Sequence, residues 1–168
     1  NILDVCSGSG CIALALRQVF QKAQVYGLEY SHDAIALAEE NALALKLPVA
    51  FKKVDVLNKE QINPVLEGVS NTSLLDIVVS NPPYIPLKEK VLMDAVVLNH
   101  EPEIALFVPD HDPLIFYKEI ARSVFPYLST KGALYFECHY LHLENTRNLL
   151  LDLGYKTVEK RKDLQGKW

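Results

Sequence analysis

The sequence lacks the usual marks of membrane, metal-binding and disulfide-stabilised proteins. None of its apolar runs approaches the roughly 20 residues that a membrane-spanning helix needs, and no secretory signal is visible. The three cysteines, Cys6, Cys11 and Cys138, show neither metal-ligand spacing nor a pairing pattern, which indicates reduced thiols. A net charge of −4 argues against a broad nucleic-acid surface but leaves a local basic cleft open. We expect a cytoplasmic protein without membrane, metal ion or direct nucleic-acid partner.

What the sequence does contain is the alternating pattern of an α/β domain. The 168 residues, 49% of them hydrophobic and 23% charged, are enough for one globular core. Strands are expected at 1–5, 23–29, 49–54, 74–79, 132–138 and 155–160. Helices are expected at 11–20, 31–46, near 90–97, at 112–128 and at 143–153, with a loop or short helix over 57–70. This alternation predicts a Rossmann-like, doubly wound, mainly parallel sheet with helices on both faces.

A glycine-containing turn, "DVCSGSGCIA", joins the first expected strand to the first helix. Gly8 and Gly10 permit positive φ angles and a close approach of the backbone to a ligand. The pattern G-x-G-x-x-A also occurs in dinucleotide-binding proteins, so alone it is a weak signal. Glu29 ends the second strand, where a carboxylate can accept both ribose hydroxyls of an adenosyl ligand. The alternative is an ordinary tight turn with a solvated glutamate.

Two further carboxylates belong to the same predicted edge of the sheet. Asp55 follows the third strand and can accept a hydrogen bond from an adenine amino group, unless it is a solvated loop residue. Asp4, on the first strand, either orients the glycine turn or meets a ligand cation through water. The complete set of expected cofactor-binding residues is Asp4, Ser7, Gly8, Gly10, Glu29, Tyr30, Asp55, Val56 and Asn81. The motifs described so far fit dehydrogenases and methyltransferases equally well.

The stretch "SNPPYIP", directly after the fourth expected strand, separates these two classes. Two prolines fix φ and supply no N–H, so the chain leaves the strand stiff and extended. The Asn81 side-chain oxygen and the Pro82 carbonyl can accept both N–H groups of a planar nitrogen and aim it at a sulfonium methyl. Hydride transfer has no need of this arrangement. The expected catalytic residues are Asn81, Pro82, Pro83 and Tyr84, the last packing against a planar substrate group; the alternative is a proline-rich turn.

With these motifs in this order, the chain resembles class I S-adenosylmethionine-dependent methyltransferases. More narrowly, it is similar to the protein-(glutamine-N5) methyltransferases of peptide chain release factors, because residues 101–120 and 162–167 resemble blocks of that family. The resemblance implies methyl transfer from S-adenosylmethionine to the glutamine of the release factor's Gly-Gly-Gln motif. It places Gly8 and Gly10 against the methionine part of the cofactor, Glu29 at the ribose and Asp55 near the adenine. A monomer is expected.

The sequence departs from that family's pattern at several positions. Cys6 stands at the first glycine of D-x-G-x-G-x-G, and either crowds the turn or indicates that the two later glycines suffice. Pro113 and His139 also stand where glycine is common, and we expect His139 to be a surface or loop residue rather than a base. The family's N-terminal helical domain and a last strand after Trp168 are not present, so 1–168 is expected to be the catalytic domain of a longer protein.

Two other functions remain open from the sequence. An adenine-N6 methyltransferase acting on DNA or RNA uses the same N-P-P-Y chemistry, although it usually brings a basic groove for a flipped base. A non-catalytic S-adenosylmethionine-binding domain is the second alternative, and the intact N-P-P-Y motif argues against it.

Overall fold

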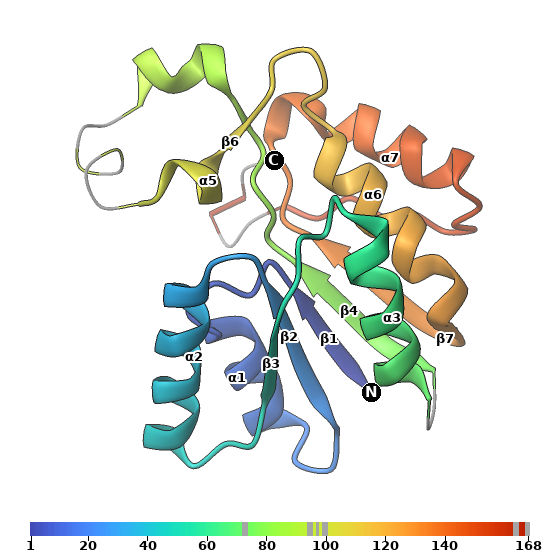
Figure 1. Ribbon diagram of the computed structural model, residues 1–168. Coiled ribbons are helices and arrows are strands. Elements are labelled where there is room, and N and C mark those ends of the chain that lie inside the picture. Colours follow the sequence, from blue (N-terminus) through green and yellow to red (C-terminus); the bar gives the residue numbers. More distant parts are fainter. Residues whose placement is uncertain (72–73, 94–95, 97, 99–100, 163–164, 167–168) are drawn as a thin grey trace.

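The computed structural model describes residues 1–71, 74–93, 96, 98, 101–162 and 165–166. Its centre is a parallel five-stranded sheet with the order β3-β2-β1-β4-β7 (Figure 1). The strands are β1 (Ile2–Val5), β2 (Val25–Glu29), β3 (Ala50–Lys53), β4 (Leu75–Ser80) and β7 (Leu128–Phe136). A separate two-stranded ladder pairs β5 (Ile85–Pro86) with β6 (Phe107–Val108). The predicted doubly wound α/β fold is confirmed.

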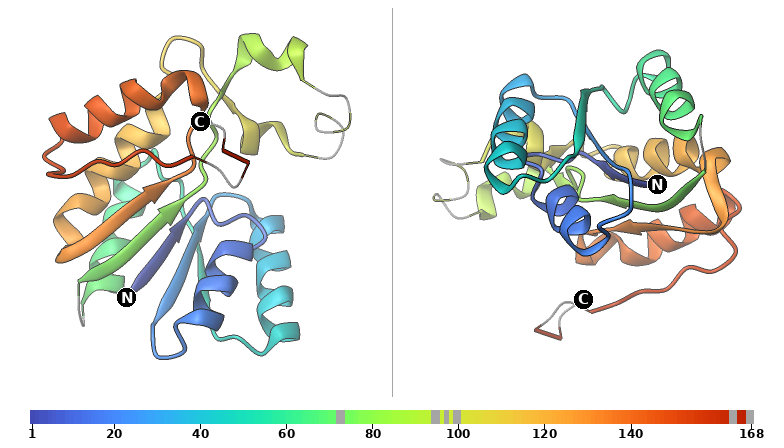
Figure 2. Two further views of the ribbon diagram at one scale, coloured as in Figure 1. Left: turned by 180° about the vertical axis from the view of Figure 1, so that it is seen from behind. Right: turned by 90° about the horizontal axis from the view of Figure 1, so that it is seen from below.

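Helices connect the strands and cover the sheet. The α-helices are α1 (Cys11–Val19), α2 (His32–Leu45), α3 (Lys59–Ser70), α5 (Glu103–Leu106), α6 (Ile115–Val124) and α7 (Leu143–Asp152). The described residues also form three short 3₁₀ helices, η1 (Leu87–Leu92), η2 (Phe125–Tyr127) and η3 (Tyr140–His142). Figure 1 and the left view of Figure 2 show β5, η1, α5 and β6 projecting beyond the carboxyl ends of the central strands. This projecting part therefore stands above the edge at which ligands bind in such folds.

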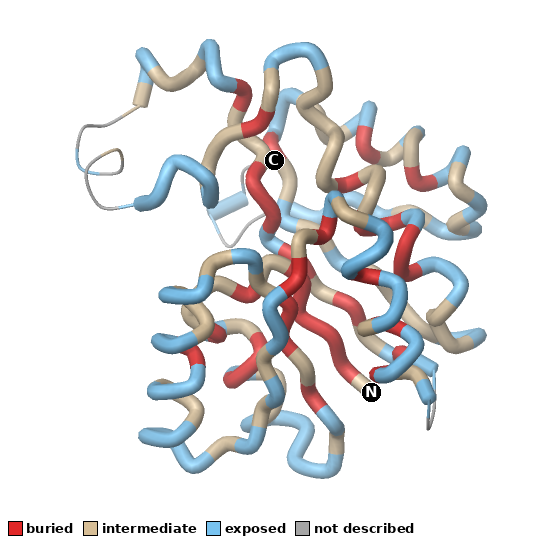
Figure 3. The backbone as a smooth tube through the Cα atoms, in the orientation of Figure 1, coloured by how far each residue is buried: buried red, intermediate tan, exposed pale blue. Residues whose placement is uncertain are grey.

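Strand β1 lies in the middle of the sheet, and its side chains show what packs against each face of the sheet. All four of its residues are buried, as the red segment of Figure 3 illustrates. Because side chains alternate along a strand, Leu3 and Val5 share one face while Ile2 and Asp4 share the other. Leu3 and Val5 belong to the cluster built with α3 and α6, whereas Ile2 packs with Ala13 of α1. Asp4 is thus a carboxylate on the face covered by α1.

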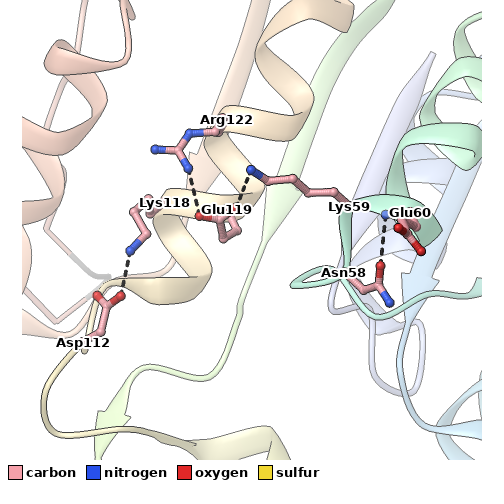
Figure 4. Close-up of polar contacts among 7 residues, drawn as sticks. All are labelled: Asn58, Lys59, Glu60, Asp112, Lys118, Glu119 and Arg122. Carbon is pink, nitrogen blue, oxygen red and sulfur yellow. Dashed lines mark hydrogen bonds and ion pairs between the residues drawn. The ribbon is translucent and has the colours of Figure 1, made fainter.

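The outer surface of α6 carries ion pairs that link it to its neighbours (Figure 4). Glu119 pairs with Arg122 at 3.0 Å and with Lys59 of α3 at 3.9 Å, and Lys118 pairs with Asp112 at 2.7 Å. Partly exposed pairs of this kind contribute about 0–1 kcal/mol each. The attachment of α6 therefore rests mainly on the buried apolar face of the same helix, where Ile120 and Val124 are fully covered.

Two expected elements differ in the structure. Residues 155–160 are not a strand, because they form no hydrogen-bonded ladder with any strand of the described residues. Instead Tyr155 donates to the Ala121 carbonyl at 2.9 Å and packs its ring against Phe125. Over 87–92 the structure has the 3₁₀ helix η1, residues 96 and 98 are α-helical as expected near 90–97, and 94–95 and 97 lie outside the described residues.

The described helices include none that is long and apolar enough to cross a bilayer. Within the same part of the chain, no group of three or more His, Cys, Asp or Glu side chains is arranged to hold a metal ion.

Candidate active site

The glycine turn and the N-P-P-Y stretch lie side by side at the topological switch point of the sheet. The chain winds outward from β1 to β3 and then returns to place β4 on the other side of β1. Val5 is in register with Ser80, and the Ser80 hydroxyl donates to the Val5 carbonyl at 2.6 Å. The segments that leave these two strands therefore start as neighbours. Doubly wound proteins bind their ligands in the crevice at this position.

The glycine turn alternates left-handed residues, with φ values of 61° at Cys6, 52° at Gly8 and 80° at Gly10. A Cβ atom on Gly10 would lie only 2.7 Å from Cζ of Phe51, so this glycine is required by packing. A Cβ atom on Gly8 would meet nothing within 4 Å, which leaves its surroundings open for a ligand. Cys6 takes the left-handed conformation at a cost of about 1 kcal/mol and keeps the turn intact.

Glu29 ties the turn to the end of β2. Its Oε2 atom accepts from the Gly8 N–H at 2.8 Å, and its Oε1 atom accepts from the N–H groups of Tyr30 and Ser31 at 2.8 and 2.9 Å. A carboxylate offers about four lone-pair sites, so three backbone donors leave room for roughly one more. To hold both hydroxyls of a ribose, as the sequence predicts, Glu29 would have to release one of these backbone groups.

Asp4 is buried beneath the turn. Its Oδ2 atom accepts from the Ala13 N–H at 3.0 Å and so fixes the first turn of α1. Its Oδ1 atom and the Ser7 hydroxyl are buried and have no hydrogen-bond partner among the described residues. Burial raises the pKa of Asp4 to about 7, against the opposing effect of the Ala13 N–H and with a smaller contribution from the Glu29 charge. Unpartnered buried polar atoms cost about 1–3 kcal/mol each, which points to a ligand that supplies the missing contacts.

A pocket of about 430 Å³ opens at the ends of β2 and β3. Its lining consists of Tyr30, Ser31, His32, Lys53, Asp55, Gln61 and Ile104. Asp55 is held there because its Oδ1 atom accepts from the Leu57 N–H at 3.0 Å and its own N–H donates to Gln61 at 3.0 Å. Val56 does not line the pocket, because its side chain is buried in the core.

In the N-P-P-Y stretch an exposed asparagine is followed by two buried prolines. Asn81 is exposed, whereas Pro82 and Pro83 are buried. Tyr84 donates its N–H to the Leu106 carbonyl at 3.2 Å and its hydroxyl to Oε1 of Glu137 at 3.0 Å. Burial and the Glu137 carboxylate raise the pKa of Tyr84 to about 12, so the phenol stays protonated. The expected catalytic segment therefore presents the Asn81 side chain to solvent, while the residues after it are held in place.

A second pocket, of about 340 Å³, lies next to Tyr84. Its lining consists of Tyr84, Ile85, Glu89, Leu92, Met93, Cys138, His139 and Tyr140. His139 lies in a loop but is not a surface residue, because only 7% of it is exposed and the Tyr140 ring stacks on its imidazole. Sequence reasoning missed Glu89, since nothing in its local pattern marks it as different from a solvated glutamate.

The sequence of the chain is similar to those of known methyltransferases. A family model for a methyltransferase domain matches residues 1–161. The chain belongs to the methyltransferase domain family. Release factor glutamine methyltransferase of Bacteroides thetaiotaomicron is 40% identical to this methyltransferase domain over 167 residues, covering 99% of the domain and 57% of that protein. The protein with the same name from Flavobacterium psychrophilum is 36% identical over 166 residues, covering 99% and 55%. The domain thus spans a little over half the length of these relatives.

Solved structures place the methyltransferase domain in the same fold. Ribosomal protein L11 methylase from Lactobacillus delbrueckii subsp. bulgaricus aligns with a TM-score of 0.57 and 19% identity, covering 95% of the domain and 64% of that chain. Precorrin-6y C5,15-methyltransferase from Geobacter metallireducens aligns with a TM-score of 0.58 and 13% identity, covering 92% and 63%. At these identities the likeness concerns the fold alone.

Proposed function

We propose that the methyltransferase domain transfers a methyl group from S-adenosylmethionine to the side-chain amide nitrogen of the glutamine in the Gly-Gly-Gln motif of peptide chain release factors. The observation that carries this proposal is the position of Asn81 and Pro82 at the carboxyl end of β4, next to the glycine turn. The names of the relatives at 40% and 36% identity support the same substrate. Neither alternative from the sequence is favoured by them. The proposal implies a cytoplasmic protein, since release factors act in translation, and we propose that it acts as a monomer.

The residues around the turn fit the cofactor. The open space beside Gly8 suits the methionine part, and the unpartnered atoms of Asp4 and Ser7 suit its polar and cationic groups. The 430 Å³ pocket beside Glu29 suits the adenosyl part, with Asp55 and Gln61 at its wall. When bound, S-adenosylmethionine would supply an electrophilic methyl group whose C–S bond breaks as the new N–C bond forms, which leaves S-adenosylhomocysteine and releases one amide proton to water.

The work of the protein is then to position a weak nucleophile. An amide nitrogen is planar because its lone pair is delocalised, and it attacks only when it begins to pyramidalise. Asn81 Oδ1 and the Pro82 carbonyl accept its two hydrogens and aim it at the methyl group. As the nitrogen gains positive charge these acceptors bind it more strongly, so they stabilise the transition state more than the ground state. The buried prolines hold both acceptors in place without reorganisation.

Transfer of labelled methyl groups tests the proposal directly. The domain, and any longer protein that contains it, would be incubated with labelled S-adenosylmethionine and either a purified release factor, a Gly-Gly-Gln peptide, or a DNA or RNA oligonucleotide. We expect label on the glutamine of the first two. Label on adenine would instead support the nucleic-acid alternative. Binding of S-adenosylmethionine by calorimetry without transfer to any acceptor would support a non-catalytic domain.

Alanine at Gly8 and at Gly10 should separate binding from folding. Gly8→Ala adds a methyl group to open space, so we expect a loss of about 1 kcal/mol in unfolding free energy from its positive φ and a much larger loss of cofactor affinity, about tenfold or more. Gly10→Ala drives the same group against Phe51 and should cost about 2–3 kcal/mol of stability. Thermal unfolding and calorimetric titration with S-adenosylhomocysteine measure both effects. Equal affinity of wild type and Gly8→Ala would place the cofactor elsewhere.

A further inference from the structure

We propose that His139 and Glu89 form a positioning pair that joins the two walls of the acceptor pocket and so holds the substrate amide in line with Asn81. The inference rests on the proposed function, because it assigns the 340 Å³ pocket beside Tyr84 to the acceptor. Nothing in the local sequence suggests the pair, since its members are 50 residues apart.

The two walls of this pocket come from separate parts of the chain. One wall is the projecting segment after β4, with Tyr84, Glu89 and Leu92, and the other is the loop after β7, with Cys138, His139 and Tyr140. Two hydrogen bonds cross between them. Tyr84 reaches Glu137 at 3.0 Å next to the N-P-P-Y stretch, and Glu89 Oε2 lies 3.0 Å from His139 Nε2 further along. The second bond therefore determines how far apart the outer parts of the walls stand.

The imidazole is held in one orientation. Its Nδ1 atom accepts from the Leu141 N–H at 3.3 Å, so the neutral ring carries its proton on Nε2 and donates it to Glu89. The ring is also fixed by its neighbours, because Tyr140 stacks on it at 5.0 Å and Tyr84 meets it edge-on at 6.1 Å. The His139 N–H lies 3.4 Å from the Tyr117 hydroxyl of α6. A ring fixed by these neighbours can hold the projecting wall through a single bond.

The Tyr84–His139 contact connects this pair to the chemistry. Tyr84 is the last residue of N-P-P-Y, and its ring touches the imidazole on the pocket side. If Glu89 no longer held the projecting segment, the wall carrying Ile85 and Leu92 would shift relative to Asn81. Misplacing a substrate by about 1 Å can cost on the order of a hundredfold in rate. Cofactor binding would change little, because it uses the turn after β1 and a pocket to whose lining the projecting part contributes only Ile104.

Kinetics on the glutamine acceptor test the pair. We expect Glu89→Ala and His139→Ala each to lower kcat/KM for the Gly-Gly-Gln acceptor about tenfold, with an unchanged KM for S-adenosylmethionine. Glu89→Gln should restore most of the activity, because its amide oxygen still accepts from Nε2. The double alanine variant should be no worse than either single one, since one bond is lost in every case. Glu103→Ala is the matched control, because Glu103 pairs with Lys90 on the same projecting segment and does not line the pocket.

Wild-type acceptor kinetics in both alanine variants would overturn the pair, as would effects that multiply in the double variant or an equal loss of S-adenosylmethionine affinity. Failure of the proposed function looks different, because wild type itself would then methylate no glutamine. In that case ¹⁵N NMR of the His139 ring tests the pair. A ring protonated at Nε2, whose proton exchanges slowly with solvent in wild type and rapidly in Glu89→Ala, supports it. Exchange that does not change in Glu89→Ala rejects it.

Discussion

Replacing Asn81 by alanine is expected to lower the rate of methyl transfer to the glutamine acceptor about a hundred- to a thousandfold. The side chain is exposed at the end of a buried strand, and none of the described residues hydrogen-bonds its amide group. Its oxygen is therefore available to the substrate at no cost to the fold. Removing it leaves one N–H of the acceptor without a partner and the nitrogen free to rotate away from the methyl group. The loss should appear mainly in kcat, because this contact strengthens in the transition state.

The same variant should fold and bind cofactor. Because the Asn81 side chain is exposed, we expect a change in unfolding free energy within about 0.5 kcal/mol. Asn81 was also expected among the cofactor-binding residues, so we expect its loss to weaken S-adenosylmethionine binding two- to threefold, which corresponds to about 0.5 kcal/mol. Asn148→Ala, at an exposed position of α7, is the matched control. Single-turnover transfer by Asn81→Ala at the wild-type rate would show that Asn81 does not hold the acceptor.

Much of the framework follows from local sequence patterns. The alternation of elements predicts the doubly wound sheet, and the glycine turn and N-P-P-Y mark where two of its strands end. These predictions succeed because each depends on residues within about ten positions of one another. Proline and glycine determine backbone conformation wherever they stand.

The parts that sequence reasoning missed depend on contacts between distant segments. His139 lies in a loop, one of the two positions expected, but its burial was not predicted, because a histidine after a strand carries no signal of burial. Its environment is made by Glu89, 50 residues earlier, and by the ring of Tyr84. Glu29 was assigned to a ribose alone, whereas it also accepts from the N–H groups of Tyr30 and Ser31, which follow it directly, and from that of Gly8, which only the folded chain brings beside it. Val56 was placed at the cofactor one residue beyond Asp55, but its side chain turns into the core.

Asp4 is expected to make the stability of the ligand-free domain fall as pH rises. Its pKa is about 7 in the folded chain and 3.8 in the unfolded chain. Below pH 3.8 both states bind the proton, and between 3.8 and about 7 only the folded state does. Each pH unit in this window therefore removes about 1.4 kcal/mol, to a total of at most about 4 kcal/mol, and no further loss occurs above it. Asp4→Asn keeps the oxygen that accepts from Ala13 and removes the titration. Its unfolding free energy, measured by denaturant from pH 4 to 8, should lack this slope.

The effect of pH on the binding of a cationic cofactor should be opposite to its effect on stability. The unpartnered Oδ1 atom of Asp4 attracts a sulfonium or ammonium group only when the carboxylate is ionised, so the affinity for S-adenosylmethionine should rise up to about tenfold per pH unit below pH 7 and then level off. Asp4→Asn should bind more weakly at pH 8 and with a flatter dependence. Calorimetry at pH 6 in two buffers of different ionisation enthalpy should detect release of about one proton by wild type and none attributable to this site in the variant. S-adenosylhomocysteine, which lacks the sulfonium charge, should show a smaller slope. Identical slopes in wild type and Asp4→Asn would mean that Asp4 acts only through the Ala13 N–H, as a support for α1 rather than as a partner of the cofactor.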